Sequence, residues 1–119
     1  MLRCFLKSKL HRVVVTQAEL DYIGSITIDR DLMDMTGMLP HEKVLVADID
    51  TGNRFETYVL EGERGSGTIC INGAAARLCD PGDRIIILQF AWLDVDIQPI
   101  PDPVVIVADD QNLNPKELI

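Results

Sequence analysis

The dipeptide Gly24-Ser25 combines the residue types that a chain needs to cut itself and make its own electrophile. A serine hydroxyl can attack the carbonyl of the preceding glycine and turn the amide into an ester. β-Elimination of that ester leaves dehydroalanine, which hydrolyses to a pyruvoyl group and ammonia. The predicted products are residues 1–24 and residues 25–119, the second beginning with a ketone.

A second Gly-Ser pair shows that the dipeptide alone is not specific. Gly65-Ser66 lies in the polar run 63–67, which is typical of a turn because glycine readily adopts positive φ. Gly24-Ser25 lies instead among the strand-forming residues of 22–28. A glycine in such a run also fits a plain bulge or bend, so the dipeptide leaves both interpretations open.

The segment 54–58 carries side chains suited to binding and protonating a carboxylate substrate. In a strand, Arg54, Glu56 and Tyr58 share one face and Thr57 points to the other. An arginine fork can bind a carboxylate through two parallel hydrogen bonds, and a tyrosine can protonate a carbanion. A surface cation and a partly buried aromatic residue fit the same pattern.

The charge of the chain limits the classes of partner. A formal net charge of −8 argues against a nucleic-acid partner, because phosphate binding requires clustered cations. Lys9 and His11 would share one face of a strand. The cations near the start of the chain could hold a small anion or simply face solvent. They are Arg3, Lys7, Lys9 and Arg12.

The small residues of 71–76 predict a backbone that a ligand can approach. Successive N–H groups that open a helical turn after Asn72 can bind an anion or an oxyanion. A plain turn and helix start explains this segment equally well.

The spacing of β-branched residues and turn signals predicts a small, closed or nearly closed β-barrel. A short helix is expected over 31–38, and turns at 50–53 and 80–83. The polar segment 109–119 is expected to be a loose tail. Strands are expected at 11–16, 26–29, 43–49, 54–60, 68–71, 84–90 and 104–107.

The length of the chain predicts one domain, and its cysteine usage fits a reducing cytoplasm. The chain has 119 residues, of which 47% are hydrophobic, and it has no apolar run long enough to span a membrane. The first 15 residues lack the apolar core of a signal peptide. Three cysteines without a Cys-x-x-Cys spacing argue against disulfides and against a metal site.

Taken together, these segments resemble the pyruvoyl-dependent aspartate 1-decarboxylases. The matching blocks occur in order and at family-like spacing over residues 1–90, and the resemblance fades beyond Trp92. Arg77 stands where the family pattern leads us to expect histidine. The matching blocks are 7–12, 22–29, 53–58, 63–67, 71–76 and 81–83.

The resemblance implies a double-psi β-barrel that forms a homotetramer with active sites between protomers. It implies that Ser25 becomes the pyruvoyl group and forms a Schiff base with substrate, while Gly24 becomes a new C-terminus. Thr57 would assist cleavage and contact substrate, and Tyr58 would be the proton donor. Substrate would also be bound by Lys9, Arg54, Asn72, Gly73, Ala74 and Ala75.

The implied reaction converts L-aspartate to β-alanine and CO₂, which serves pantothenate and coenzyme A biosynthesis. The only cofactor would be the pyruvoyl group made from Ser25, with neither a metal nor pyridoxal phosphate. The sequence leaves open whether a maturation factor assists cleavage, and whether the pocket distinguishes aspartate from glutamate.

The same residues are also compatible with two other functions. An unprocessed β-barrel could bind a small acidic metabolite or a protein partner, and it would remain one intact chain. A regulatory DNA-binding barrel is the second alternative, and the net charge of −8 weighs against it.

Overall fold

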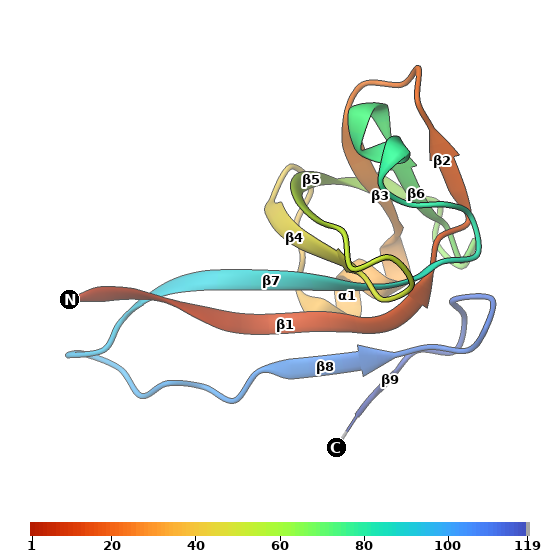
Figure 1. The fold of residues 1–119 in the computed structure, drawn as a ribbon. Coiled ribbons are helices and arrows are strands. Elements are labelled where there is room, and N and C mark those ends of the chain that lie inside the picture. Colours follow the sequence, from red (N-terminus) through yellow and green to blue (C-terminus); the bar gives the residue numbers. More distant parts are fainter. Residues whose placement is uncertain (119) are drawn as a thin grey trace.

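The computed structural model describes residues 1–118, and Ile119 lies outside the described residues. No helix within this range is long and apolar enough to cross a membrane. The elements in chain order are β1 (Leu2–Val14), β2 (Gln17–Glu19), β3 (Ser25–Asp29), α1 (Arg30–Thr36), β4 (Lys43–Asp48), β5 (Arg54–Gly62), β6 (Ile69–Asn72), the 3₁₀ helix η1 (Gly73–Arg77), β7 (Arg84–Asp94), β8 (Val104–Val107) and β9 (Lys116–Glu117) (Figure 1).

The strands form one hydrogen-bonded sheet in the order β2-β6-β3-β5-β4-β7-β1-β8-β9. The β4–β5 hairpin is antiparallel, as its turn residues predict, whereas β3 pairs with β5 in parallel. Apolar side chains from β1, from β3 to β7 and from α1 pack into one buried core. This mainly β architecture with short helical turns confirms the predicted fold class and is consistent with a small β-barrel.

The strand β1 is much longer than the sequence predicts. It begins at Leu2, whereas the expected strand began at residue 11, and its register with β7 runs from Leu2–Asp94 to Val14–Arg84. Figure 1 shows the two strands side by side out to the N-terminus. Hydrogen bonding to β7 makes this segment a strand despite its cations, of which Arg3 and Lys7 face solvent.

The carboxylate of Asp29 joins α1 to the loop before β6. It caps the helix by accepting a hydrogen bond from the Asp31 N–H, and Gly37 ends the helix in the left-handed conformation. The same carboxylate accepts hydrogen bonds from the N–H groups of Gly65 and Gly67, both of which have positive φ. The second Gly-Ser pair is therefore in a turn, as its composition predicts.

The expectation of a loose tail over 109–119 is wrong for the described part of that segment. Asn112 is buried, its amide donates to the carbonyl oxygens of Val14 and Gly67, and its Oδ1 accepts from the Val14 N–H. Farther along, β9 pairs with β8. A polar composition could not reveal that one asparagine side chain satisfies the backbone of two distant segments.

Three carboxylates gather beside the turn between β4 and β5. One oxygen each from Asp48, Asp50 and Asp83 lies within 4.8 Å of the others, and Oδ2 of the buried Asp48 has no hydrogen-bond partner. The Asp48 carboxyl raises the pKa of the neighbouring Asp83, because a protonated Asp83 can donate a hydrogen bond to Asp48 and two charged carboxylates repel. The pair is therefore more stable with one shared proton.

We predict that Asp48→Asn raises the melting temperature at pH 7. Because the folded-state pKa of Asp83 is raised, its stabilising contribution is complete below about pH 4 and is lost as the pH rises through that pKa. An asparagine amide is a permanent donor to Asp83, so the gain should be a few degrees at pH 7 and should shrink in acid.

Thermal unfolding between pH 4 and 8 measures this effect. The matched control is Asp102→Asn, which removes one exposed charge outside the cluster. A gain for Asp48→Asn that is the same at every pH would contradict proton sharing.

Candidate active site

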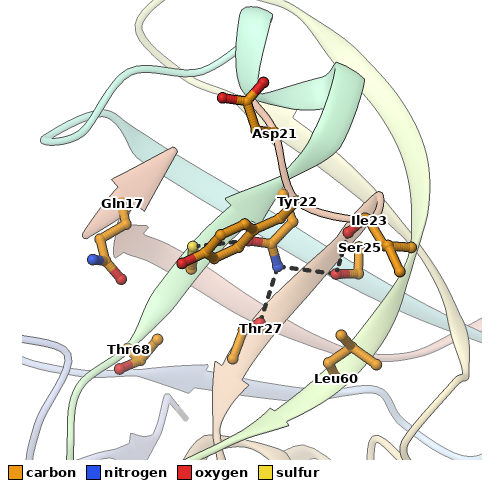
Figure 2. Close-up of a pocket in the computed structure, with 10 residues that line it drawn as sticks. Gln17, Asp21, Tyr22, Ile23, Ser25, Thr27, Leu60 and Thr68 are labelled. Atoms are coloured by element: carbon orange, nitrogen blue, oxygen red, sulfur yellow. Dashed lines mark hydrogen bonds between the residues drawn. The ribbon is translucent and has the colours of Figure 1, made fainter. Parts of the chain in front are cut away.

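Ser25 is the first residue of β3, and its side chain is completely buried although Ile23 and Gly24 before it are exposed. Its hydroxyl donates to the Ile23 carbonyl oxygen at 3.3 Å and accepts from Asn72 Nδ2 at 2.9 Å. Figure 2 shows these bonds at the Ser25 side chain. The nucleophile expected from the sequence is therefore held in place next to the exposed bond that it would attack.

The pairing of β3 with β6 assembles the polar group around this hydroxyl. The antiparallel register sets Ser25 opposite Asn72 and Thr27 opposite Cys70. Residues two apart in a strand share a face, so all four side chains lie together. Asn72 Nδ2 also donates to Thr27 Oγ1 at 3.1 Å, and Cys70 Sγ lies 3.1 Å from Asn72 Oδ1.

Gly73 follows Asn72 and allows the backbone to pass close to Gly24. It has a φ of 77°, and a Cβ there would lie 2.6 Å from Gly24 Cα and 2.8 Å from Gly24 N. No side chain fits at such distances, so glycine is required for both its conformation and its size. Asn72 therefore contacts the Ser25 hydroxyl while the backbone of Gly73 packs closely against Gly24.

An open hollow of about 610 Å³ lies over this polar group, with Ser25, Thr27, Asn72 and Leu60 among the residues that line it. Tyr22, which is 62% exposed, also contributes to its wall (Figure 2). Pockets that bind small molecules have volumes in this range. The hollow is large enough for an amino acid, and the Ser25 side chain that borders it has no exposed surface in the uncleaved chain.

Thr57 and Tyr58 lie on β5, the parallel neighbour of β3. Ile26 is opposite Val59, so the residues just before Val59 lie toward the Gly24-Ser25 end of β3. The register of β5 with β4 runs without interruption from Tyr58 to Arg54, so no bulge turns Thr57 toward the face of Tyr58. Both residues are half-buried and line a separate hollow of about 280 Å³.

The structure does not bring the expected cationic residues to Ser25 within the described chain. Arg54 is exposed at the start of β5, and Lys9 is half-buried in β1 between Leu88 of β7 and Val105 of β8. Neither lines the hollow at Ser25. The pKa of His11 is lowered by burial and then by the charges of Lys9 and Arg12, so this histidine is neutral at pH 7.

The alanines after Gly73 contribute less to this hollow than the sequence predicts. The helical turn expected after Asn72 is present as η1, with Ala74 exposed and Ala75 packed against the core. Neither alanine lines the hollow. Arg77 is exposed in the last turn of η1.

Sequence reasoning missed several residues of the hollow, among them Gln17, Thr27 and Cys70. Thr27 lies two residues after Ser25, and Cys70 lies two residues before Asn72. The alternation of side chains along a strand is the signal that could have identified both. Gln17 reaches the hollow only because β2 pairs with β6, which no local pattern indicates.

Comparison with known proteins gives a consistent result over nearly the whole chain. The sequence model of the family described as aspartate decarboxylase matches residues 1–114. The aspartate 1-decarboxylase of Thermoanaerobacter pseudethanolicus is 56% identical over 112 residues, which cover 94% of this chain and 96% of that protein. The aspartate 1-decarboxylase of Acetivibrio thermocellus is 55% identical over 107 residues, covering 90% and 85% respectively. These matches show that this chain belongs to the aspartate decarboxylase family, and the contacts of Asn72 with Ser25 and of Gly73 with Gly24 agree with that result.

Proposed function

We propose that this chain is a pyruvoyl-dependent aspartate 1-decarboxylase that makes its prosthetic group by cleavage at Gly24-Ser25. It would convert L-aspartate to β-alanine and CO₂. The observation that carries the proposal is the buried Ser25 hydroxyl, fixed by Asn72 beneath an exposed Gly24, in a chain of the aspartate decarboxylase family.

The residues around Ser25 fit a pyruvoyl group at this position. The Ser25 side chain lines the open hollow, so a ketone in its place would face a bound substrate. The Asn72 amide beside it can donate a hydrogen bond to a carbonyl oxygen as well as to a hydroxyl. A pyruvoyl ketone binds a substrate amine covalently and accepts the electrons of the bond that breaks.

Cleavage would begin with attack of Ser25 Oγ on the Gly24 carbonyl carbon. The new C–O bond replaces the C–N bond, so the amide becomes an ester and the Ser25 nitrogen becomes an amine. Loss of the Ser25 α-proton then breaks the Cβ–Oγ bond and releases the Gly24 carboxylate. Water replaces the nitrogen of the dehydroalanine that remains, which yields the ketone and ammonia. The two products are a fragment of residues 1–24 and a fragment of residues 25–119.

Thr57 is the proposed donor to the oxyanion that forms on Gly24 during this attack. Its support is the parallel pairing of β3 with β5, which directs the segment before Val59 toward Gly24. A hydrogen bond aimed at a developing negative charge can contribute about 3 kcal/mol to such a step.

Lys9 and Arg54 would hold the carboxylates of the substrate and orient the bond that breaks. Because neither lines the Ser25 hollow in its own chain, we propose that they reach the site across the interfaces of a homotetramer. Large exposed apolar side chains support association: Ile23 is 84% exposed, Trp92 is 70% and Ile97 is 79%. Substrate in such a site would contact two protomers.

Tyr58 would deliver the proton that completes β-alanine. It lies on the face of β5 that also carries Arg54, so one strand would supply both the carboxylate-binding cation and the acid. The product would feed pantothenate and coenzyme A synthesis in the cytoplasm. Failure of the purified chain to process itself would indicate that cleavage needs a maturation factor.

The first test compares the two Gly-Ser pairs. Ser25→Ala should leave a single chain on a denaturing gel and no turnover of aspartate above background, because it removes the attacking oxygen. Ser66→Ala changes a serine in the exposed turn and should cleave and react like the wild type. Aspartate decarboxylation by Ser25→Ala at the wild-type rate would refute the proposed function.

The second test concerns the close approach at Gly73. Gly73→Ala would place a Cβ 2.6 Å from Gly24 Cα, so the backbone must move and cleavage should slow by at least about tenfold. The matched control is Gly82→Ala, which has a φ of 93° but no atom within 4 Å of the added Cβ. Both variants carry backbone strain, so equal cleavage rates would mean that the contact with Gly24 has no effect.

The third test isolates the proton donor. Tyr58→Phe should still cleave, but its kcat for aspartate should fall by about 10²-fold with little change in KM. Intact mass measures the cleavage, and released CO₂ measures the turnover. A wild-type kcat would assign the proton transfer to another acid.

A further inference from the structure

The hollow at Ser25 contains a thiol that the proposed chemistry does not use. Cys70 lies in β6, two residues before Asn72, and only 5% of it is exposed. Its sulfur is 3.1 Å from Asn72 Oδ1, the amide oxygen on the opposite side of the group from Ser25. Three side chains therefore form a chain of hydrogen bonds that ends at the attacking oxygen.

We propose that Cys70 is a positioning residue, whose S–H group fixes the orientation of the Asn72 amide and thereby of the Ser25 hydroxyl for cleavage. This inference rests on the proposed function.

The amide of Asn72 has two possible orientations, and the thiol favours one of them. An amide oxygen only accepts, an amide nitrogen only donates, and a thiol is a weak donor and a weak acceptor. With Oδ1 toward sulfur, the S–H group donates to it and Nδ2 faces Ser25 and Thr27. The opposite orientation would set an N–H group against a sulfur that accepts poorly.

The orientation of the amide decides what the Ser25 hydroxyl does with its own proton. When Asn72 donates to Ser25 Oγ, the hydroxyl hydrogen is free to bond with the Ile23 carbonyl oxygen. An N–H donated to Oγ also stabilises negative charge on that oxygen as the proton leaves. In the reversed orientation the hydroxyl would donate to Asn72, and this stabilisation would be lost.

The environment of Cys70 keeps the hydrogen on its sulfur. Burial and then the charge of Glu19 raise the pKa of this thiol, so it is protonated at neutral pH. A thiolate would have no hydrogen to donate and would repel the amide oxygen. The geometry and the protonation state therefore agree.

The test measures the rate of cleavage in freshly purified, full-length chains by intact mass. Cys70→Val fills a similar volume without a donor and should cleave at least tenfold more slowly than the wild type. Cys70→Ala also lacks the donor and has a smaller side chain, so it replaces Cys70→Val in this test if the valine variant does not fold. Cys70→Ser keeps a donor and should cleave within about threefold of the wild-type rate.

A matched control separates this role from the general effect of changing a buried thiol. Cys79→Ala alters a thiol that is 2% exposed and does not line the hollow, so cleavage should be unaffected. Melting temperatures identify any variant that is slow because it is unstable. Rescue by serine is the readout that a purely structural role would not give.

Two outcomes would overturn the inference. Wild-type cleavage rates in both Cys70→Val and Cys70→Ala would show that the donor is not needed. A well-folded Cys70→Ser that is as slow as Cys70→Val would show that a hydrogen-bond donor at this position does not restore cleavage. If the wild-type chain itself never cleaves and never decarboxylates aspartate, the proposed function fails instead.

Discussion

The antiparallel pairing of β3 with β6 is the constraint on which the rest of the site depends. It sets Ser25 opposite Asn72, so that the buried hydroxyl and the amide meet at 2.9 Å. One residue farther along, the positive φ of Gly73 lets the chain turn directly over Gly24. A change in this register by one residue would send each of these side chains to the opposite face of its strand.

The same pairing suits both steps of the proposed self-cleavage, the attack by Ser25 and the departure of a new chain end. Ser25 Oγ is buried, where a donated hydrogen bond is strong, whereas Gly24 is exposed and a new chain end could leave into solvent. After cleavage the end of β3 would remain paired with β6 and β5, so the new group would keep its place at the hollow. In the proposed homotetramer, residues of another protomer would bind substrate without altering this arrangement.

Local signals predicted much of the fold. The β4–β5 hairpin, the helix ended by Gly37 and the turn at Gly65 each follow from a few adjacent residues. Ser25 and Asn72 were both predicted as site residues, but their hydrogen bond joins segments that are far apart in sequence. Asn112, which anchors the segment expected to be loose, shows the same limit, because its partners lie on β1 and in the loop before β6.

The proposed chemistry requires that Ser25 becomes the reactive end of a new chain. Intact-mass measurement of the purified protein after denaturation tests it most directly. We expect two species, residues 1–24 and 25–119. The larger should be lighter by one ammonia than a fragment that begins with serine, and it should react with hydroxylamine. A single full-length mass that persists through prolonged warming, in a preparation that nevertheless decarboxylates aspartate, would contradict it.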